Sequence, residues 1–432
     1  MTNFKSPFLQ EIQGRGFLHQ CTHLDELDQL MAAQSITFYI GYDATAPSLH
    51  VGNLMTIMLL RIAQRHGHKP LILMGGATTK VADPSGKDKS RPPLAHADIQ
   101  SNIRSIQGVF EKYVCFDGST NRATMINNAE WLENLDYLTF LETYGPHFTI
   151  NRMLTFDSVK LRLEREQPLS FLEFNYMILQ AYDFLKLYRE QRCVLQMGGS
   201  DQWGNIVNGV ELIRRVDGKQ AFGLTIPLIT TASGSKMGKS ASGAVWLNSD
   251  MLSPYDYWQF WRNTEDADVI RFMKYFTDLT LEDIAAYETL EGEALNEAKI
   301  RLADETTRLA HGNDVLQEVK IAVEKLFEQK TIAVDIIGQD EKGIPILQSS
   351  VPIVQITQTA LEEGLPVYAA LVCVGLAKSN GEAKRLISGG GCRLNDEAIS
   401  DPLALLTLEM AQPPGIIKMA AGKKRFAFLQ II

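Results

Sequence analysis

The stretch that decides the fold is residues 35–76, SITFYIGYDATAPSLHVGNLMTIMLLRIAQRHGHKPLILMGG. Its first six residues are mostly β-branched or aromatic, which predicts a strand, and the turn formers in GYDATAPS predict a loop after it. Apolar residues at helical spacing follow from Leu54 to His66, and the apolar run PLILM is closed by Gly75 and Gly76. This order of strand, helix and strand predicts a βαβ unit in a parallel α/β sheet, with functional residues in the loops after the strands.

The same α/β pattern extends outward to about residue 229. Residues 171–188 read as one long helix, and CVLQM at residues 193–197 reads as a buried strand that ends at two glycines. Helical patterns without strand signals follow from residue 253, which predicts a separate helical domain. Turn formers without a sustained period at residues 329–354 predict a linker, and a small terminal unit follows it.

Composition limits the classes of function. The chain has 432 residues, of which 45% are hydrophobic and 22% charged, as in ordinary globular proteins of two or three domains. The formal net charge of -9 argues against a surface coated in basic patches, so a nucleic-acid contact would have to be local. One candidate is residues 366–432, where eight Lys or Arg stand against five Asp or Glu.

The cysteines and the N-terminus suggest a compartment. Five scattered cysteines, without a CxxC pair or a nearby His at metal-ligand spacing, predict reduced thiols. The N-terminus lacks the long apolar core of a signal peptide, and no run approaches about 18 apolar residues. We therefore expect a soluble, cytoplasmic protein that does not contact a membrane.

The segment SGSKMGKS at residues 233–240 places Lys236 and Lys239 in a loop rich in glycine and serine. Such a loop offers backbone donors and mobile cations to a polyphosphate. It is not a P-loop, because three residues instead of four separate Gly234 from Gly238 and no helix start follows. By itself the segment is better explained by a solvated surface loop.

HVGN at residues 50–53 follows a turn cluster and opens a predicted helix, so His50 and Asn53 lie at a helix N-terminus suited to an anion. Gly52 would allow close approach of a ligand to the backbone. A merely structural helix cap explains the same residues.

In the long predicted helix, Tyr176, Gln180 and Asp183 fall on one face and could line a pocket together. An ordinary exposed face is the alternative. Two polar loops add candidates: residues 82–91, and GGSDQWGN at residues 198–205, which follows a strand where ligands bind in open α/β sheets.

Together these segments resemble the class I aminoacyl-tRNA synthetases, and within them the bacterial and organellar tyrosyl-tRNA synthetases. HVGN is similar to the HIGH signature and KMGKS to the KMSKS signature, while YIGYDATAPSLHVGN, FNYMILQAYD and GGSDQWGN resemble blocks of the tyrosyl group. The resemblance covers nearly the whole chain. It implies a Rossmann-like parallel-sheet catalytic domain, an all-α domain, and a small α+β RNA-binding domain of the S4 type. The expected boundaries are 1–230 for the catalytic domain, 231–328 for the signature loop and helical anticodon-side domain, 329–365 for a linker, and 366–432 for the S4-like domain.

The resemblance implies a tyrosine pocket. Tyr39 and Asp183 are expected to bind the phenol hydroxyl of the substrate, and Asp83, Tyr176 and Gln180 its ammonium group. A buried donor and acceptor for the hydroxyl would reject phenylalanine, because their hydrogen bonds would be left unmade. The full set of expected tyrosine-binding residues is Tyr39, Asp83, Tyr176, Gln180, Asp183, Gln196 and Gln202.

The implied reaction is attack of the tyrosine carboxylate on the α-phosphate of ATP, followed by transfer to the terminal ribose of tRNA(Tyr). Because the carboxylate is already ionised, the first step needs positioning and cations but no general base. Mg²⁺ is expected to bind through the phosphates, without protein ligands. The expected catalytic residues are Thr45, His50, Asn53, Lys236, Lys239 and Ser240. The expected ATP-binding residues are Gly41, Asp43, His50, Gly52, Asn53, Thr56, Gly199, Asp201 and Lys239. Lys87 and Arg91 match a loop near the phosphates and the tRNA.

The chain departs from the two signatures at two positions. Asn53 stands where HIGH has its last His, so it can serve only if that role is neutral hydrogen bonding. Gly238 stands where KMSKS has Ser, which predicts a more flexible loop with both lysines kept.

The resemblance also implies macromolecular partners. Residues 376–396 resemble the S4 module and predict tRNA contacts by Lys384, Arg385 and Arg393, although a generic basic helix explains the same pattern. Residues of about 127–151 resemble the insertion through which these enzymes form homodimers.

Two alternatives stay open from the sequence. A tryptophanyl-tRNA synthetase shares the fold but does not need the hydroxyl pair Tyr39 and Asp183. A noncatalytic RNA-binding relative could keep the fold, although it would have no chemical reason to keep His50, Lys236 and Lys239 together.

Overall fold

The computed structural model describes residues 3–85, 94–118, 120–234, 237–240, 243–328, 335–339, 345–348, 351–362, 364–422 and 425–432. The chain divides into two compact units. The first comprises Met1–Gly238 and Glu265–Ala298, and the second comprises Lys239–Thr264 and Lys299–Ile432.

The first unit is built on a six-stranded sheet in the order β1-β6-β5-β2-β3-β4. The five strands from β6 to β4 are parallel, and only β1 runs antiparallel, against β6. The parallel α/β sheet predicted from the sequence is therefore confirmed. The strand bounds are β1 Gln20–Cys21, β2 Thr37–Tyr42, β3 Lys69–Met74, β4 Thr124–Asn127, β5 Cys193–Gly199 and β6 Phe222–Ile226.

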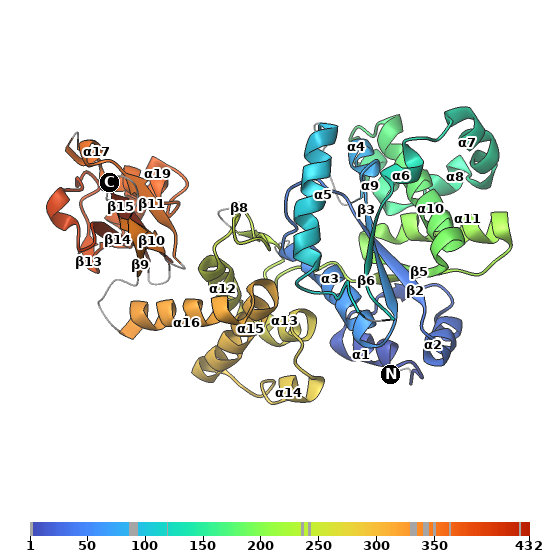
Figure 1. Ribbon diagram of the computed structural model, residues 1–432, viewed down its shortest axis with the longest axis horizontal. Helices are drawn as coiled ribbons and strands as arrows, with labels where there is room; N and C mark the ends of the chain where they lie inside the picture. The colour runs from blue at the N-terminus through green and yellow to red at the C-terminus, as the bar shows by residue number, and fades with distance from the viewer. Residues whose placement is uncertain are drawn as a thin grey trace. The chain divides into compact units, whose positions relative to one another are not determined.

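The strand order reverses between β2 and β5. From β2 the chain builds outward through β3 to β4, and then returns to place β5 on the other side of β2. A ligand cleft forms at such a switch point, beyond the carboxyl ends of the two strands. Helices cover both faces of this sheet, with α3 and α5 on one side and α10 and α11 on the other (Figure 1). These helices span α3 Val51–Arg65, α5 His96–Phe110, α10 Phe171–Gln191 and α11 Trp203–Asp217.

Helix α10 begins and ends where the sequence provides caps. The Ser170 hydroxyl accepts from the Glu173 backbone N–H at 3.1 Å, and the Glu173 carboxylate accepts from the Ser170 N–H at 3.0 Å. The helix ends at Gln191, and its C-cap Arg192 adopts a left-handed conformation with φ of 51°. Buried Arg162, from α9 (Asp157–Glu164), pairs with Glu173 at 3.2 Å and so fastens α9 to the start of α10. The capping box thus fixes the helix that carries Tyr176, Gln180 and Asp183.

Residues 265–298 return to the first unit as α13 (Val269–Phe276) and α14 (Leu281–Ala285). Buried Arg15, the last residue of α1 (Pro7–Arg15), donates to the carbonyls of Lys274, Thr277 and Leu279 at 2.9, 3.3 and 2.7 Å. Asp278 accepts from Arg61 of α3 at 2.6 Å, and from Arg65 at 2.8 Å. The end of α13 is therefore tied to the ends of α1 and α3.

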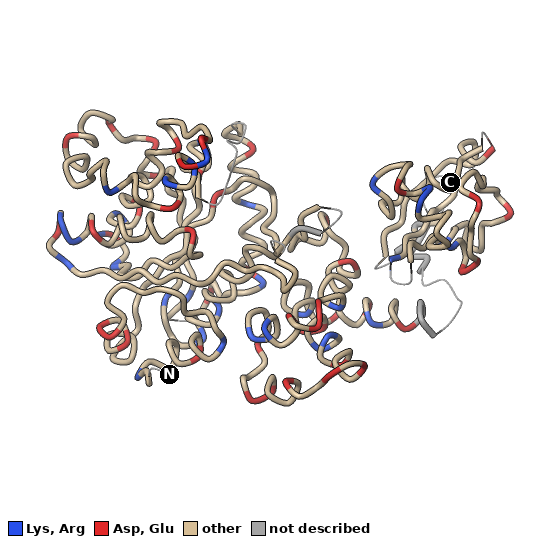
Figure 2. Tube along the Cα trace, turned by 180° about the vertical axis from the view of Figure 1, so that it is seen from behind, with Lys and Arg blue, Asp and Glu red and all other residues tan. Residues whose placement is uncertain are grey.

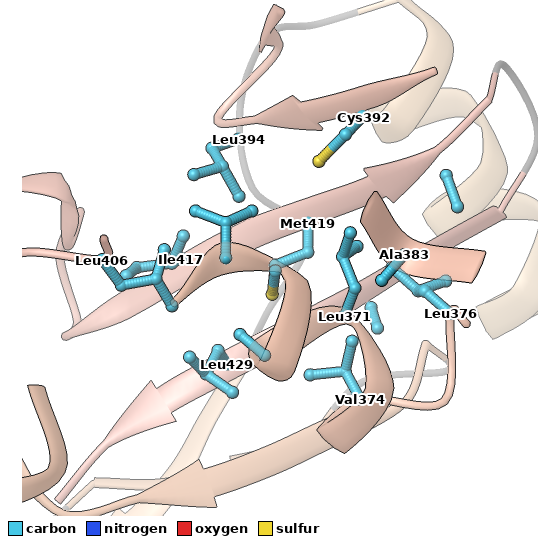
Figure 3. Close-up of a cluster of buried hydrophobic side chains, with 14 of the residues drawn as sticks. Leu371, Val374, Leu376, Ala383, Cys392, Leu394, Leu406, Ile417, Met419 and Leu429 are labelled. Carbon is cyan, nitrogen blue, oxygen red and sulfur yellow. The ribbon is translucent and has the colours of Figure 1, made fainter. Parts of the chain in front are cut away.

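The second unit contains α12 (Pro254–Arg262), most of α15 (Leu295–His311), α16 (Asn313–Glu328) and a C-terminal sheet. That sheet has five strands in the order β11-β15-β14-β12-β13. Its apolar core joins two helices to the strands through residues such as Leu371, Ala383, Ile417 and Leu429 (Figure 3). The bounds are β11 Ile353–Ile356, β12 Cys392–Leu394, β13 Glu397–Ile399, β14 Ile416–Ala421, β15 Arg425–Ile431, α17 Gln358–Glu362, α18 Val367–Cys373 and α19 Asn380–Ser388.

Two expected boundaries differ from the structure. The linker predicted at residues 329–365 contains the hairpin β9 (Asp335–Gln339) and β10 (Pro345–Gln348), and β11 pairs in parallel with β15 of the C-terminal sheet. These strands are too short to show a periodic pattern. The helical domain predicted at residues 231–328 is divided between the two units, because α13 and α14 pack with the first. No helix of the described residues is long and apolar enough to cross a membrane.

Candidate active site

Asp183 is the buried acid of the site, with 2% of its surface exposed. One carboxylate oxygen accepts from the indole N–H of Trp131 at 2.7 Å, and the other accepts from the side-chain amide of Asn128 at 3.0 Å. Burial raises the pKa of Asp183 to about 7, although these two hydrogen bonds lower it. Each oxygen can still accept from a ligand, because a carboxylate has about four acceptor sites.

Tyr39 lies at 1% exposure on β2, beside Gln196 of the neighbouring strand β5. Its hydroxyl has no hydrogen-bond partner among the described residues. Burial raises the pKa of Tyr39 well above its usual value, and the charge of Asp183 raises it further, so the hydroxyl stays protonated. A buried hydroxyl donor without a partner is costly, and here it lies within the electrostatic reach of an acid. The Oε1 atom of Gln196 is also buried without a hydrogen-bond partner.

A second acid, Asp43, follows β2 directly. It accepts from the Tyr176 hydroxyl at 3.2 Å and from the Thr78 hydroxyl at 3.0 Å. A Cβ on Gly75, after β3, would lie 2.3 Å from a carboxylate oxygen of Asp43, so a larger residue there would displace this side chain. Asn128 donates to the Thr78 hydroxyl at 3.0 Å, so Asp43 and Asp183 belong to one hydrogen-bonded network.

A third acid, Asp83, is joined to α10 through the loop after β5. Gln202 donates to Asp83 at 2.9 Å, and Asn205 donates to Gln202 at 3.2 Å and to Gln180 at 3.0 Å. Ala82 precedes Asp83 with φ of 70°, a backbone conformation that L residues rarely adopt and that is typical of functional sites. Three acids around Tyr176 and Gln180 form a site suited to an ammonium group.

HVGN caps helix α3 as the sequence allows. Nδ1 of His50 accepts from the Gly52 N–H at 3.0 Å, which puts the proton of a neutral ring on Nε2. The side-chain oxygen of Asn53 accepts from the His50 N–H at 3.2 Å, which leaves its amide N–H₂ as the donor of that side chain. Both side chains thus combine the cap with donors at the positive end of a helix.

The described part of the second signature touches the first. Gly238 has φ of 91°, and a Cβ on it would lie 2.8 Å from the backbone nitrogen of Gly52 and 3.2 Å from Nδ1 of His50. Met237 beside it is buried. Lys236, Lys87 and Arg91 lie outside the described residues, and for Lys239 and Ser240 only the backbone, strand β7 (Lys239–Ser240), is described.

The remaining predicted residues fall into two groups. Those expected at the nucleotide lie at the carboxyl ends of β2 and β5, in the loops after these strands, or in the first turns of α3. In α3, Thr56 accepts from the Tyr42 hydroxyl at 3.0 Å. The loop with Thr45 is held by neighbouring Ala44, whose N–H donates to Thr79 at 2.9 Å. The second group, the expected tRNA-binding residues Lys384, Arg385 and Arg393, lies in the C-terminal sheet unit, which comprises residues 351–432, and all three are exposed. The Nζ atom of Lys384 lies 4.3 Å from the ring centre of Tyr368. The nucleotide group comprises Gly41, Asp43, Thr45, His50, Gly52, Asn53, Thr56, Gly199 and Asp201.

The structure adds polar residues that the sequence pattern did not single out. Thr78, Asn128 and Trp131 connect two of the acids, and Asn205 connects Gln180 to Gln202. Thr78 and Asn128 follow strands β3 and β4, so the rule that ligands bind beyond strand ends could have found them. Trp131 carried no such signal. Among the described residues no group of three or more His, Cys, Asp or Glu is arranged to hold a metal ion.

Comparison with known proteins gives a consistent picture. Residues 31–328 match the family model described as tRNA synthetases class I (W and Y). The tyrosine–tRNA ligase of Caulobacter vibrioides is 56% identical over 430 residues, which is 99% of this chain and 99% of that protein. The tyrosine–tRNA ligase of Rhodospirillum rubrum is 53% identical over 432 residues, which is 100% of each.

Solved structures agree. The C-terminally truncated mitochondrial tyrosyl-tRNA synthetase of Aspergillus nidulans is similar with a TM-score of 0.66 at 31% identity, over 74% of this chain and 94% of that chain. A tryptophanyl-tRNA synthetase of Encephalitozoon cuniculi, at 12% identity and a TM-score of 0.53 over 72% of this chain and 87% of that one, shares the fold alone.

Proposed function

Because the chain belongs to the tyrosyl-tRNA synthetases of class I, we propose how its own residues divide the work of this reaction. The enzyme is a tyrosine–tRNA ligase, which activates L-tyrosine with ATP and transfers it to tRNA. The full-length relatives at 50–56% identity are tyrosine enzymes, which answers the tryptophan alternative left open by the sequence. We also propose that the protein works in the cytoplasm, where tRNA and ATP are available.

The buried, unpartnered hydroxyl of Tyr39 carries the proposal for the substrate pocket. We infer that the phenol oxygen of tyrosine accepts from Tyr39 and that its proton is donated to Asp183. The ammonium group then binds among Asp83, Tyr176 and Gln180, with Gln196 and Gln202 completing the pocket. A substrate without the hydroxyl would leave both buried groups unpaired, which is the physical basis for choosing tyrosine over phenylalanine.

Activation is in-line attack of the tyrosine carboxylate on the α-phosphate, with pyrophosphate leaving. His50, Thr45 and Asn53, near the positive end of α3, would donate hydrogen bonds to phosphate oxygens, and Gly52 would let adenine approach the backbone. Lys236, Lys239 and Ser240 would meet the negative charge that develops as pyrophosphate departs, assisted by Lys87 and Arg91. Mg²⁺ would bind chiefly through the phosphate oxygens of ATP and water, and would supply further positive charge at the phosphates.

The substitution Lys239→Ala tests this assignment. We expect single-turnover tyrosyl-adenylate formation to slow by at least about a hundredfold, with the Kd for tyrosine within about twofold of wild type. The matched control is Lys219→Ala, which removes an exposed lysine that belongs to neither signature segment. An unchanged rate in Lys239→Ala would refute the transition-state role. Tyrosine and tryptophan tested side by side in pyrophosphate exchange check the pocket independently.

We propose that the homodimer forms through an apolar surface that begins in the predicted insertion. Residues 137–172 carry nine large hydrophobic side chains that are at least 39% exposed, with Leu138 at 74%. Exposed apolar surface of this density marks a protein–protein interface. Leu138→Glu is expected to produce monomers in analytical ultracentrifugation, whereas Leu403→Glu, at a comparably exposed position outside the surface, is not.

The C-terminal sheet unit is proposed to bind tRNA. Acidic and basic residues are interspersed along the traced chain, so a local contact is required rather than a continuous basic face (Figure 2). Lys384 and Arg385 on α19, with Arg393 on β12, would contact phosphates. Lys418 is excluded from that role, because it is buried in an ion pair with Asp396 at 2.9 Å.

A further inference from the structure

Asp268 is a buried acid that the reaction described above does not use. It lies immediately before α13 with 1% of its surface exposed. One of its oxygens accepts from the backbone N–H of Ala232 at 2.7 Å. The other pairs with Arg271, one turn later, and Arg271 also donates to the carbonyl of Thr230 at 2.6 Å. The start of α13 therefore holds the backbone of residues 230–232, which leads directly into SGSKMGKS.

Two further contacts fix Ser233 and Gly234, the first two residues of SGSKMGKS. The Ser233 hydroxyl donates to the carboxylate of Glu265 at 2.7 Å. Gly234 bonds back to the Thr231 carbonyl at 2.9 Å, which closes a turn. The chain thus enters the signature from a point fixed by Glu265, Asp268 and Arg271.

The other end of α13 is anchored to the helix that carries the first signature. Asp278, just after α13, forms ion pairs with Arg61 and Arg65 of α3, at 2.6 and 2.8 Å. Helix α3 begins at Val51 with His50 as its N-cap, so one signature caps α3 while the start of α13 holds the chain that leads to the other. Helices α3 and α13 therefore form a frame: they are joined to each other by ion pairs, α3 carries HVGN, and the start of α13 holds the chain that leads into KMGKS.

Helix capping alone does not explain this arrangement. An ion pair between Asp268 and Arg271 would satisfy the first turn of α13 without any contact to residues 230–232. Instead, the acid accepts from one side of that segment and the guanidinium donates to the other, which fixes the backbone in both position and direction. A cation that acts only on charge developing in the transition state is sensitive to such positioning, and a shift of about 1 Å costs up to about a hundredfold in rate.

We propose that Asp268 and Arg271 are positioning residues for tyrosyl-adenylate formation. They fix the entry of the segment that carries Lys236 and Lys239, and so the reach of those lysines toward the phosphates. The inference rests on the role proposed above for these two lysines.

The first test compares two Asp→Asn substitutions at buried acids that accept backbone N–H groups. Asp268→Asn is expected to slow adenylate formation at saturating ATP about ten- to a hundredfold, with the Kd for tyrosine within about twofold. The control is Asp28→Asn, because Asp28 accepts from the N–H groups of Lys5 and Ser6 at 2.9 and 2.8 Å, away from both signatures. It should lower Tm without slowing the reaction. Equal slowing in both variants would overturn the proposal, since it would reflect loss of stability only.

The second test asks whether Asp268 acts through the lysines. In a background that lacks both lysines, Lys236→Ala with Lys239→Ala, Asp268→Asn should slow the remaining reaction by less than about twofold, because the cations that it positions are gone. A full, independent loss in this triple variant would overturn the proposal. If Lys239→Ala is slow while Asp268→Asn is as fast as wild type, the positioning role alone fails. If Lys239→Ala is itself fast, the role of the lysines and this inference fail together.

A milder variant covers the case in which Asp268→Asn does not fold. Ser233→Ala removes the hydrogen bonds of the exposed Ser233 hydroxyl to Glu265 and to the Thr231 hydroxyl, and leaves the pair Asp268 and Arg271 intact. It should slow adenylate formation about threefold with tyrosine affinity unchanged. A wild-type rate in this variant, together with an unfolded Asp268→Asn, would overturn the positioning role.

Discussion

At the scale of single residues, the proposed tyrosine pocket depends on Asp183, whose carboxylate is held by two side-chain donors in the ligand-free structure. Replacing it by Asn keeps the size but removes the charge and brings an N–H₂ group toward the donors Asn128 and Trp131. We expect kcat/KM for tyrosine in pyrophosphate exchange to fall about ten- to a hundredfold, with a much smaller change for phenylalanine. An equal loss for both amino acids would show that Asp183 does not read the hydroxyl.

The same residue predicts a pH dependence. Burial raises the pKa of Asp183 to about 7 in the ligand-free protein. In the proposed pocket, the phenol proton is donated to the ionised form of Asp183. Tyrosine affinity should therefore be full above pH 7 and weaken as the pH falls through 7, by up to about tenfold per pH unit below it. Equilibrium dialysis with labelled tyrosine between pH 6 and pH 8 measures this, and Asp183→Asn should abolish it. A flat profile in the wild type contradicts the assignment.

Single residues also show where sequence reasoning ends. Tyr176, Gln180 and Asp183 were predictable, because helical spacing puts them on one face whatever the rest of the fold does. Their partners were not, since Trp131 and Asn128 meet Asp183 only after some fifty residues of intervening chain have folded, and no periodic pattern encodes that contact. The shared helix face of these three residues was therefore predictable from the sequence, whereas the hydrogen bonds that Asn128 and Trp131 donate to Asp183 are seen only in the folded structure.

At the scale of elements, Gly238 connects the two signature segments. An alanine there would meet the backbone of Gly52 and would have to adopt a positive φ, which L residues disfavour by about 1–2 kcal/mol. We expect Gly238→Ala to slow adenylate formation at least about tenfold, with tyrosine affinity unchanged. Gly218→Ala, at a positive φ of 62° with open space around it, is the control for backbone strain alone. Similar rates in the two variants would exclude a role for the close contact.

The elements themselves were predicted unevenly. Composition, hydrophobic period and caps predict the strands and helix of residues 35–76 and the long helix α10. The structure confirms all of these elements. Strands β9 to β11 were missed because they are short and are stabilised by pairing with other strands, which a local sequence pattern does not show. Strand β11 pairs with β15, more than seventy residues further along the chain.

At the scale of the whole molecule, the C-terminal sheet defines where the chain should be cut. Because β11 belongs to that sheet and Gln430 bonds to Pro345 of β10 at 2.7 Å, a cut at residue 366 would leave strands unpaired. Deleting residues 329–432, just after α16, should leave tyrosyl-adenylate formation within about twofold and weaken aminoacylation of tRNA more than about tenfold. Equal aminoacylation by the truncated chain would refute the tRNA-binding role.

The interleaving of the two units has a consequence for how the protein is made. The first unit needs residues 265–298, yet residues 239–264, which belong to the second, are synthesised before them. A nascent chain that has emerged from the ribosome only as far as Gly238 therefore has its sheet but not α13, and Arg15, Arg61 and Arg65 still lack their partners around Asp278. Folding of the catalytic core should thus finish late in translation, so the chain gains the frame between its two signatures only when about two thirds of it has been made.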